Sequence, residues 1–273
     1  AMKVARKNEI PFVYEMRGIW EDTAVANGRW KRWGLAYRRF KRMETKVLRS
    51  ADKVYCISEQ LRNDAINRGV DIKKISVIRN AVNEELFLDE DSEDNEVITR
   101  IRKKLMLEKG TSVIGYIGSI QPLEGLDFLA KAISIAKEEN ENIRLLILST
   151  KKNQDSLRET CDNLGIGGIT TITGPVERKM IPNCYSLIDI FAVCRPPGFR
   201  VTEMVTPLKP FEAMAKGLPV LISDLPALKE IVSDEETGIL FSAGDSTDLA
   251  GKILDAIKSP ERMNEIGNNA KIG

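Results

Sequence analysis

From residue 112 onward, short apolar runs alternate with longer stretches in which apolar residues recur every three or four positions. The apolar runs are the expected strands: 112–120, 143–150, 168–174, 188–194, 219–223 and 238–242. The stretches between and after them are the expected helices: 125–139, 154–164, 180–187, 209–217 and 245–258. Strands that alternate with helical runs of roughly ten or more residues predict a parallel sheet with helices on both faces. The larger part of the chain is therefore expected to be an α/β domain with a Rossmann-like sheet.

Residues 1–85 are expected to form a partial second domain of the same kind. Its expected strands cover 11–16, 53–58 and 75–82, which is too few for a covered parallel sheet. Charge also separates the two parts: residues 1–80 hold 19 Lys and Arg against 9 Asp and Glu, and the remainder holds 22 against 31. A stretch that is first acidic and then basic, 88–110, is typical of a linker that runs into a short helix. We therefore place the domain boundary between 85 and 86.

Composition excludes several classes of function. Histidine is absent, which excludes His-based catalytic triads and His metal sites within this chain. Neither G-x-G-x-x-G nor G-x-x-x-x-G-K-[ST] occurs, which argues against a dinucleotide oxidoreductase and a P-loop NTPase. Four widely spaced cysteines suit a reducing compartment, and no apolar run reaches the roughly 18 residues of a membrane span. We expect a cytoplasmic protein without a metal, since the run Asp89-Glu90-Asp91 lies in the charged linker.

The segment after the strand at 188–194 is the most informative for function. Its sequence RPPG predicts a turn, and a loop from Arg200 to Lys209 is expected to follow. Thr206 is a candidate cap, and Pro207 and Pro210 suit the first turn of the helix that ends near residue 217. This helix begins at the carboxyl edge of the predicted sheet, where ligands bind in open α/β folds. Exposed amide groups there favour a phosphate.

Three segments carry a resemblance to a known family. They are PLKPFEAMAKGLPVLISDLPALKEIV (207–232), GYIGSIQPLEGLDFLAKAI (115–133) and PFVYEMRGIWED (11–22). Together they resemble the family 4 (group 1) glycosyltransferases, which have the GT-B fold. The resemblance implies a retaining transfer of sugar from a nucleotide-diphosphate sugar, a UDP- or GDP-sugar, to a glycan or lipid-linked acceptor in polysaccharide or glycolipid biosynthesis. It also implies that the first half of the N-terminal domain would precede residue 1.

Two glutamates follow from the resemblance. Glu212 matches the family carboxylate that binds the ribose hydroxyls; the alternative is a first-turn glutamate that only complements the helix dipole. The family has a second glutamate eight positions earlier, which contacts the sugar. Here Met204 occupies that position and Glu203 lies one residue further back, so Glu203 either takes over this catalytic contact or has another role.

The expected diphosphate contacts differ from the family pattern. Where the family has Arg and Lys in the first loop of this domain, this sequence has Ser119 and Glu124. A leaving diphosphate needs positive charge or N–H donors. We expect Lys209 and one arginine to replace the missing pair, with backbone groups helping. The candidate arginines are Arg200 and Arg195, and the candidate backbone groups lie at Gly118, Ser119 and Thr206. The alternative is that these cations are rim residues and nucleotide binds weakly.

Further assignments stay open from the sequence alone. The turn at Val176 either contacts the nucleobase, as the resemblance implies, or is a plain strand exit. Arg17, Glu21 and Asp22 either line the acceptor side of the cleft or form ordinary ion pairs on a surface loop. Residues 29–50 predict a basic helix with aromatic side chains. It either contacts an anionic membrane surface or is a domain helix with a solvated basic face; nucleic acid is not expected.

Two other functions fit the same fold. One is a truncated protein that binds a nucleotide sugar without catalysis, and the other is a nucleotide-sugar epimerase of the GT-B fold.

Overall fold

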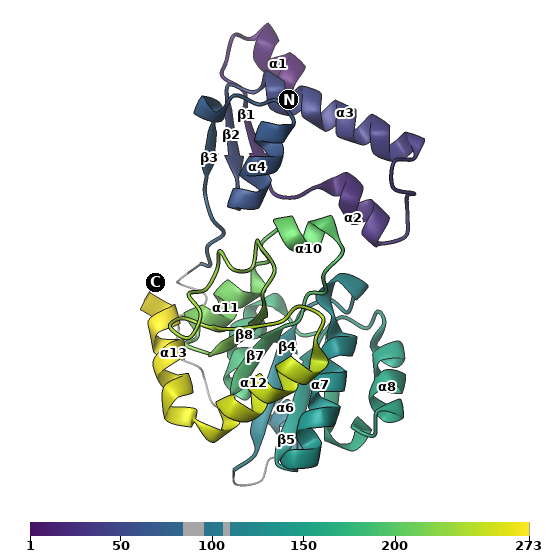
Figure 1. The fold of residues 1–273 in the computed structure, drawn as a ribbon, viewed down its shortest axis with the longest axis vertical. Coiled ribbons are helices and arrows are strands. Elements are labelled where there is room, and N and C mark those ends of the chain that lie inside the picture. Colours follow the sequence, from purple (N-terminus) through teal and green to yellow (C-terminus); the bar gives the residue numbers. More distant parts are fainter. Residues whose placement is uncertain (84–95, 106–109, 273) are drawn as a thin grey trace. The chain divides into compact units, whose positions relative to one another are not determined.

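A computed structural model describes residues 1–83, 96–105 and 110–272, so the acidic run at 89–91 lies outside the described residues. The chain forms two compact units (Figure 1). The first unit consists of residues 1–80, 197–207 and 225–230. The second unit consists of residues 81–196, 208–224 and 231–273. Two short segments predicted to lie in the C-terminal domain therefore belong to the first unit.

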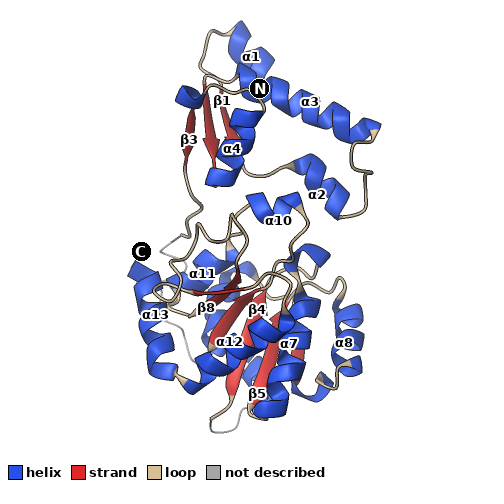
Figure 2. Cartoon of the chain, viewed as in Figure 1, coloured by secondary structure: helices blue, strands red, loops and turns tan. Residues whose placement is uncertain are grey.

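The first unit contains a three-stranded parallel sheet in the order β1-β2-β3 (Figure 2). Its strands are β1 (Val13–Met16), β2 (Lys53–Cys56) and β3 (Ile75–Val77). Its helices are α1 (Met2–Lys7), α2 (Trp20–Ala26), α3 (Leu35–Ser50), α4 (Glu59–Asn67) and α10 (Arg200–Met204). The predicted loop from Arg200 to Lys209 is thus wrong in its first half, where α10 forms after the turn of the Pro-Pro-Gly sequence. All three predicted strands exist, but each is shorter than expected.

Hydrogen bonds fix the two late segments within the first unit. The Ser58 hydroxyl caps α4 by accepting from the Leu61 amide at 3.1 Å, and it donates to the Met204 carbonyl at 2.6 Å. The carboxylate of Glu230 accepts from the amides of Glu59 and Gln60 at 2.7 and 3.2 Å. These groups at the start of α4 therefore bind both 197–207 and 225–230.

The second unit contains a six-stranded parallel sheet in the order β6-β5-β4-β7-β8-β9. Its strands are β4 (Ser112–Ile117), β5 (Ile143–Leu148), β6 (Thr170–Thr173), β7 (Ile190–Val193), β8 (Val220–Ser223) and β9 (Ile239–Phe241). The strand order reverses between β4 and β7: β5 and β6 lie outside β4, whereas β8 and β9 lie outside β7. Such a reversal leaves a crevice at the carboxyl ends of the central strands.

Helices flank this sheet, and those predicted at 125–139, 154–164, 209–217 and 245–258 exist with bounds within two residues of the predicted ones. The flanking helices are α6 (Glu96–Leu105), α7 (Leu126–Glu139), α8 (Gln154–Asn163), α9 (Ile181–Cys184), α11 (Lys209–Ala215), α12 (Ser246–Lys258) and α13 (Pro260–Ile272). The single helix predicted at 180–187 is wrong: 3-10 turns at Arg178–Met180 and Tyr185–Leu187 flank the four-residue α9. Within the described part of the chain, no helix is both long and apolar enough to cross a bilayer.

Candidate functional site

A lysine and a glutamate meet at the carboxyl edge of the second sheet, between β4 and β7. Lys209 is the first residue of α11, and its Nζ donates to Oε1 of Glu124 at 2.7 Å. Arg195, which follows the end of β7, places Nη2 at 3.4 Å from the same oxygen. The Glu124 side chain is only 9% exposed and that of Lys209 18%. Glu124 therefore pairs with two of the cations that were predicted for the site.

Burial and charge act in opposite directions on this cluster. Burial alone would raise the pKa of Glu124, but Arg195 and Lys209 outweigh it and lower that pKa overall. Burial lowers the pKa of Lys209, and Glu124 opposes this shift. The Glu124 carboxylate therefore favours the protonated form of Lys209.

Gly118 makes room for the lysine. It follows β4 with a φ of +156°, and a Cβ placed on it would lie 2.2 Å from Cε of Lys209. The ring of Tyr116 supports the ammonium group from another side, with Nζ 5.2 Å from its centroid. The Tyr116 hydroxyl donates to the Ser119 carbonyl at 3.2 Å. The predicted residues Gly118, Ser119 and Lys209 are thus brought together.

Glu212 is held by a tyrosine that the sequence did not single out. The glutamate lies in the first turn of α11 with Lys209, and its Oε2 accepts from the Tyr185 hydroxyl at 2.7 Å. Tyr185 is fully buried, and burial followed by the charge of Glu212 raises its pKa well above the ordinary value. The tyrosine therefore remains a donor and orients the carboxylate. An aromatic residue after a short helix carries no sequence signal for this contact.

The remaining predicted residue of the second unit lies after β6. Val176 is half-buried and follows Gly174, where a Cβ would lie 2.2 Å from the Ser149 carbonyl oxygen. The backbone therefore packs closely at this strand exit. A nucleobase contact at Val176 stays a prediction.

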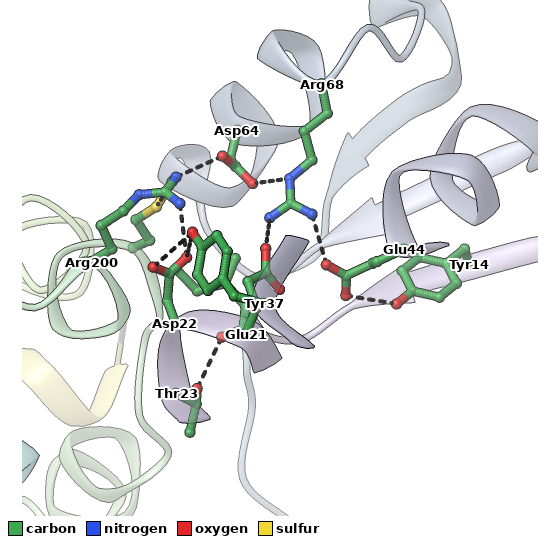
Figure 3. Close-up of polar contacts among 11 residues, drawn as sticks. Tyr14, Glu21, Asp22, Thr23, Tyr37, Glu44, Asp64, Arg68 and Arg200 are labelled. Carbon is green, nitrogen blue, oxygen red and sulfur yellow. Dashed lines mark hydrogen bonds and ion pairs between the residues drawn. The ribbon is translucent and has the colours of Figure 1, made fainter. Parts of the chain in front are cut away.

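Arg200, Glu203 and Thr206 belong to the first unit and have partners there. Arg200 donates to Asp22 and to Asp64, both at 2.8 Å (Figure 3). Glu203 accepts from the Gly198 amide at 3.3 Å. The predicted capping role of Thr206 is wrong, because its hydroxyl contacts the Ile57 carbonyl at 3.3 Å and α11 has no side-chain cap. Donor contacts by Arg200, Glu203 and Thr206 stay predictions.

A buried ion-pair network surrounds Arg68 in the first unit (Figure 3). The Arg68 guanidinium donates to Asp64 at 2.6 Å and to Glu21 and Glu44 at 2.8 Å. Its side chain is 4% exposed. Burial opposes the charge on Arg68, but the carboxylates, Asp64 first, raise its pKa overall. Arg68 gave no sequence signal, because its partners lie far apart along the chain.

The carboxylates of α2 belong to this network. Glu21 is fully buried, and Asp22 is 6% exposed and accepts from the Tyr37 hydroxyl at 3.2 Å. The surface-loop alternative for these two residues is therefore wrong, whereas Arg17 is exposed and pairs with Glu15 at 2.8 Å. An acceptor contact by Arg17, Glu21 or Asp22 stays a prediction.

Two protein-family models match the chain. The description "Glycosyl transferases group 1" matches residues 97–272, and "Glycosyltransferase Family 4" matches residues 1–86. D-inositol 3-phosphate glycosyltransferase 2 of Catenulispora acidiphila is 24% identical over 237 residues, covering 83% of this chain and 53% of that protein. Alpha-monoglucosyldiacylglycerol synthase of Streptococcus pneumoniae is 25% identical over 265 residues, covering 96% and 57%. The chain thus spans little more than half the length of these two relatives.

Solved structures show the same fold. Anabaena HepE in complex with UDP-glucose superposes with a TM-score of 0.77 at 18% identity, covering 99% of this chain and 69% of that one. Sucrose-phosphate synthase from Thermosynechococcus elongatus superposes with a TM-score of 0.75 at 20% identity, covering 99% and 65%. The predicted GT-B fold with Rossmann-like parallel sheets is confirmed.

Proposed function

Because the chain belongs to the group 1 glycosyltransferases, we propose that it binds a UDP- or GDP-sugar and transfers the sugar, with retention of configuration, to an acceptor hydroxyl. The donor binds the second unit at the carboxyl edge of its sheet. Support comes from HepE, which has this fold and was crystallised with UDP-glucose. The residues of this chain that take part lie at the edge of the second sheet: Lys209, Arg195, Glu124 and Glu212.

One observation carries the proposal. The first turn of α11 presents Lys209 and, three residues later, the tyrosine-bound Glu212, where the strand order reverses. A carboxylate accepts two hydroxyl hydrogen bonds side by side, as a ribose offers. A buried ammonium stabilises a phosphate strongly, because the surroundings screen its charge poorly. Ribose and diphosphate are adjacent in a nucleotide, as Glu212 and Lys209 are on this turn.

Lys209 and Arg195 then act on the leaving group. Transfer breaks the bond between the anomeric carbon and the β-phosphate oxygen, and the acceptor oxygen bonds to that carbon. Negative charge develops on the departing phosphate, which takes up the acceptor's proton. Fixed cations at this position stabilise the transition state more than the ground state. Glu124 holds both cations in place before the donor arrives. Neither this step nor any other in the proposal requires a metal ion.

The acceptor is proposed to be a glycan or a lipid-linked molecule, in polysaccharide or glycolipid assembly at the cytoplasmic side of a membrane. One relative is named for a diacylglycerol lipid product and another for an inositol phosphate. Glycerol and inositol both carry hydroxyl groups, which supports this class of acceptor.

The donor is tested by thermal shift with UDP-, GDP- and dTDP-sugars, compared between the wild type and Glu212→Ala. We expect one nucleotide to stabilise the wild type and to lose most of its effect in Glu212→Ala. Glu261→Ala is the matched control, since Glu261 is an exposed glutamate in the first turn of α13. A nucleotide effect that survives in Glu212→Ala would contradict the ribose role.

Chemistry is tested separately by the release of nucleoside diphosphate with and without a candidate acceptor. Release that depends on the acceptor supports transfer. Binding without release supports the alternative of a non-catalytic nucleotide-sugar binder. Conversion of the sugar without any acceptor supports the epimerase.

A further inference from the structure

The outward face of α3 combines basic and apolar side chains. Leu35, Arg38, Arg39, Arg42, Met43 and Lys46 line one shallow hollow of about 780 Å³. Their spacing of three or four residues places them on one side of the helix. The opposite side carries the buried Tyr37, Glu44 and Leu48. We call the first set the α3 basic face.

The charge on this face is unbalanced. The helix carries six basic residues: Arg38, Arg39, Lys41, Arg42, Lys46 and Arg49. Its acidic residue, Glu44, points inward and pairs with Arg68 at 2.8 Å. Over the described ranges, no ion pair is formed by the basic residues of the α3 basic face. A row of cations on a helix without acidic neighbours attracts a polyanionic surface.

Exposed apolar side chains lie among these cations. Leu35 is 89% exposed and Met43 is 56% exposed, two turns further along the same side. Trp33, just before the helix, is 52% exposed. Its ring packs edge-on against Tyr37 at 5.1 Å and lies 5.2 Å from Nζ of Lys41. A second hollow of about 460 Å³ lies beside this tryptophan and is lined by Arg38, Arg42 and Lys46 among others.

We propose that the α3 basic face docks on the surface of a bilayer that contains anionic phospholipids. The cations meet the lipid phosphates, and Leu35, Met43 and Trp33 enter the boundary between headgroups and acyl chains. A helix of this type lies in the plane of the interface, where both kinds of side chain are satisfied. A tryptophan is suited to that depth, since its ring is apolar and its N–H is polar.

A nucleic acid fits the same face less well. It would engage the arginines but would leave Leu35 and Met43 in water, because a phosphodiester backbone offers them no apolar partner. Stacking of successive bases needs several exposed aromatic platforms. Trp33 offers one, whereas Tyr37 is buried and Phe40 packs against Trp30 at 5.7 Å. The exposed side chains of Leu35 and Met43 therefore favour a bilayer surface over a nucleic acid.

Cosedimentation of the full chain with vesicles tests the electrostatic part. We expect binding to phosphatidylcholine vesicles that contain phosphatidylglycerol and none to phosphatidylcholine alone. The variant Arg38→Gln/Arg42→Gln/Lys46→Gln should lose affinity by more than about tenfold. Its control, Arg102→Gln/Lys103→Gln/Lys104→Gln on α6, removes the same charge from exposed positions in the second unit and should bind as the wild type does. Equal losses in the two variants would overturn the proposal.

The variant Leu35→Ser/Met43→Ser tests the apolar part. We expect several-fold weaker binding to the anionic vesicles and unchanged binding to heparin or to an RNA oligonucleotide, neither of which offers an acyl-chain layer. Tryptophan quenching by brominated lipid should occur in the wild type and fall in Trp33→Phe. Tight RNA binding without vesicle binding, or vesicle binding that is unaffected by Leu35→Ser/Met43→Ser, would refute docking on a bilayer.

Discussion

Nζ of Lys209 lies 2.7 Å from Oε1 of Glu124, although the two residues are 85 positions apart in the sequence. The resemblance to the family predicts a cation at the position of Glu124, and this chain has a carboxylate there. Lys209, on α11, places a cation at the same edge of the sheet, and its side chain packs where a Cβ on Gly118 would lie. The carboxylate in one loop and the lysine on the facing helix are therefore two parts of one arrangement.

Replacing Lys209 tests the donor role of this arrangement. Lys209→Gln should weaken UDP binding by about tenfold or more, since a charge-assisted hydrogen bond contributes roughly 1.5–3 kcal/mol. Isothermal titration measures the affinity. Lys131→Gln, an exposed lysine on α7, should not change it. Equal affinities of Lys209→Gln and Lys131→Gln would mean that the diphosphate binds elsewhere.

Glu124 should control the pH range of binding. In Glu124→Gln the attraction that raises the pKa of Lys209 is gone, whereas the burial that lowers it remains. Lys209 then loses its proton at lower pH, and UDP affinity should begin to fall at lower pH than in the wild type. Titrations over neutral to alkaline pH check this, with Glu138→Gln on α7 as an exposed control. An unshifted profile would show that Glu124 does not support the charge of Lys209.

Gly118 should be intolerant of a methyl group. The Cβ of Gly118→Ala would lie 2.2 Å from Cε of Lys209, on a backbone with φ of +156°. We expect Lys209 to be displaced and UDP affinity to fall several-fold, with a lower melting temperature. Gly251→Ala is the control, because this helical glycine has open space around it; it should be neutral or stabilising by about 0.5–1 kcal/mol. Full affinity in Gly118→Ala would contradict the close packing.

Arg68 should be a major determinant of the stability of the first unit. Arg68→Met leaves the buried Glu21 and Glu44 without their cation, whereas Asp64 keeps its ion pair with Arg200. Removing one partner of a buried pair costs about 3–5 kcal/mol. Urea unfolding should show this loss. Arg62→Met breaks the part-exposed pair with Glu59 and should cost no more than about 1 kcal/mol. Similar midpoints for the two variants would mean that solvent reaches the network.

The protonation of Glu44 gives this network a pH dependence. Burial, followed by the charge of Glu21, raises the pKa of Glu44. A raised carboxyl pKa contributes stability that is present below the unfolded pKa of roughly 4.3 and is lost as pH rises through the folded value. The free energy of unfolding of the wild type should therefore fall relative to that of Glu44→Gln as pH rises above about 4.3. A free energy of unfolding of the wild type that instead rises relative to that of Glu44→Gln would contradict this prediction.

Periodicity predicted the second unit well, because strands buried on both faces are nearly continuous apolar runs such as Ile190–Val193. It overestimated strand lengths: β5, for example, ends at Leu148, whereas a strand was predicted over 143–150. Site residues after β4, after β7 and on α11 were predictable because the ends of parallel strands meet at one edge. Contacts between side chains that are far apart in the sequence could not be predicted. Arg200 and Asp22 are 178 positions apart, and charged side chains in a sequence suggest solvent exposure rather than burial.

Residues 197–207 and 225–230 join the first unit although their neighbours in sequence form the second. The polypeptide consequently changes unit at five places, beginning after Asn80. No single cleavage of the chain can therefore separate the two units intact. An excised 86–273 piece would retain Arg200 but not Asp22 or Asp64. A domain exchange between relatives must therefore transfer the segments 197–207 and 225–230 together with residues 1–80.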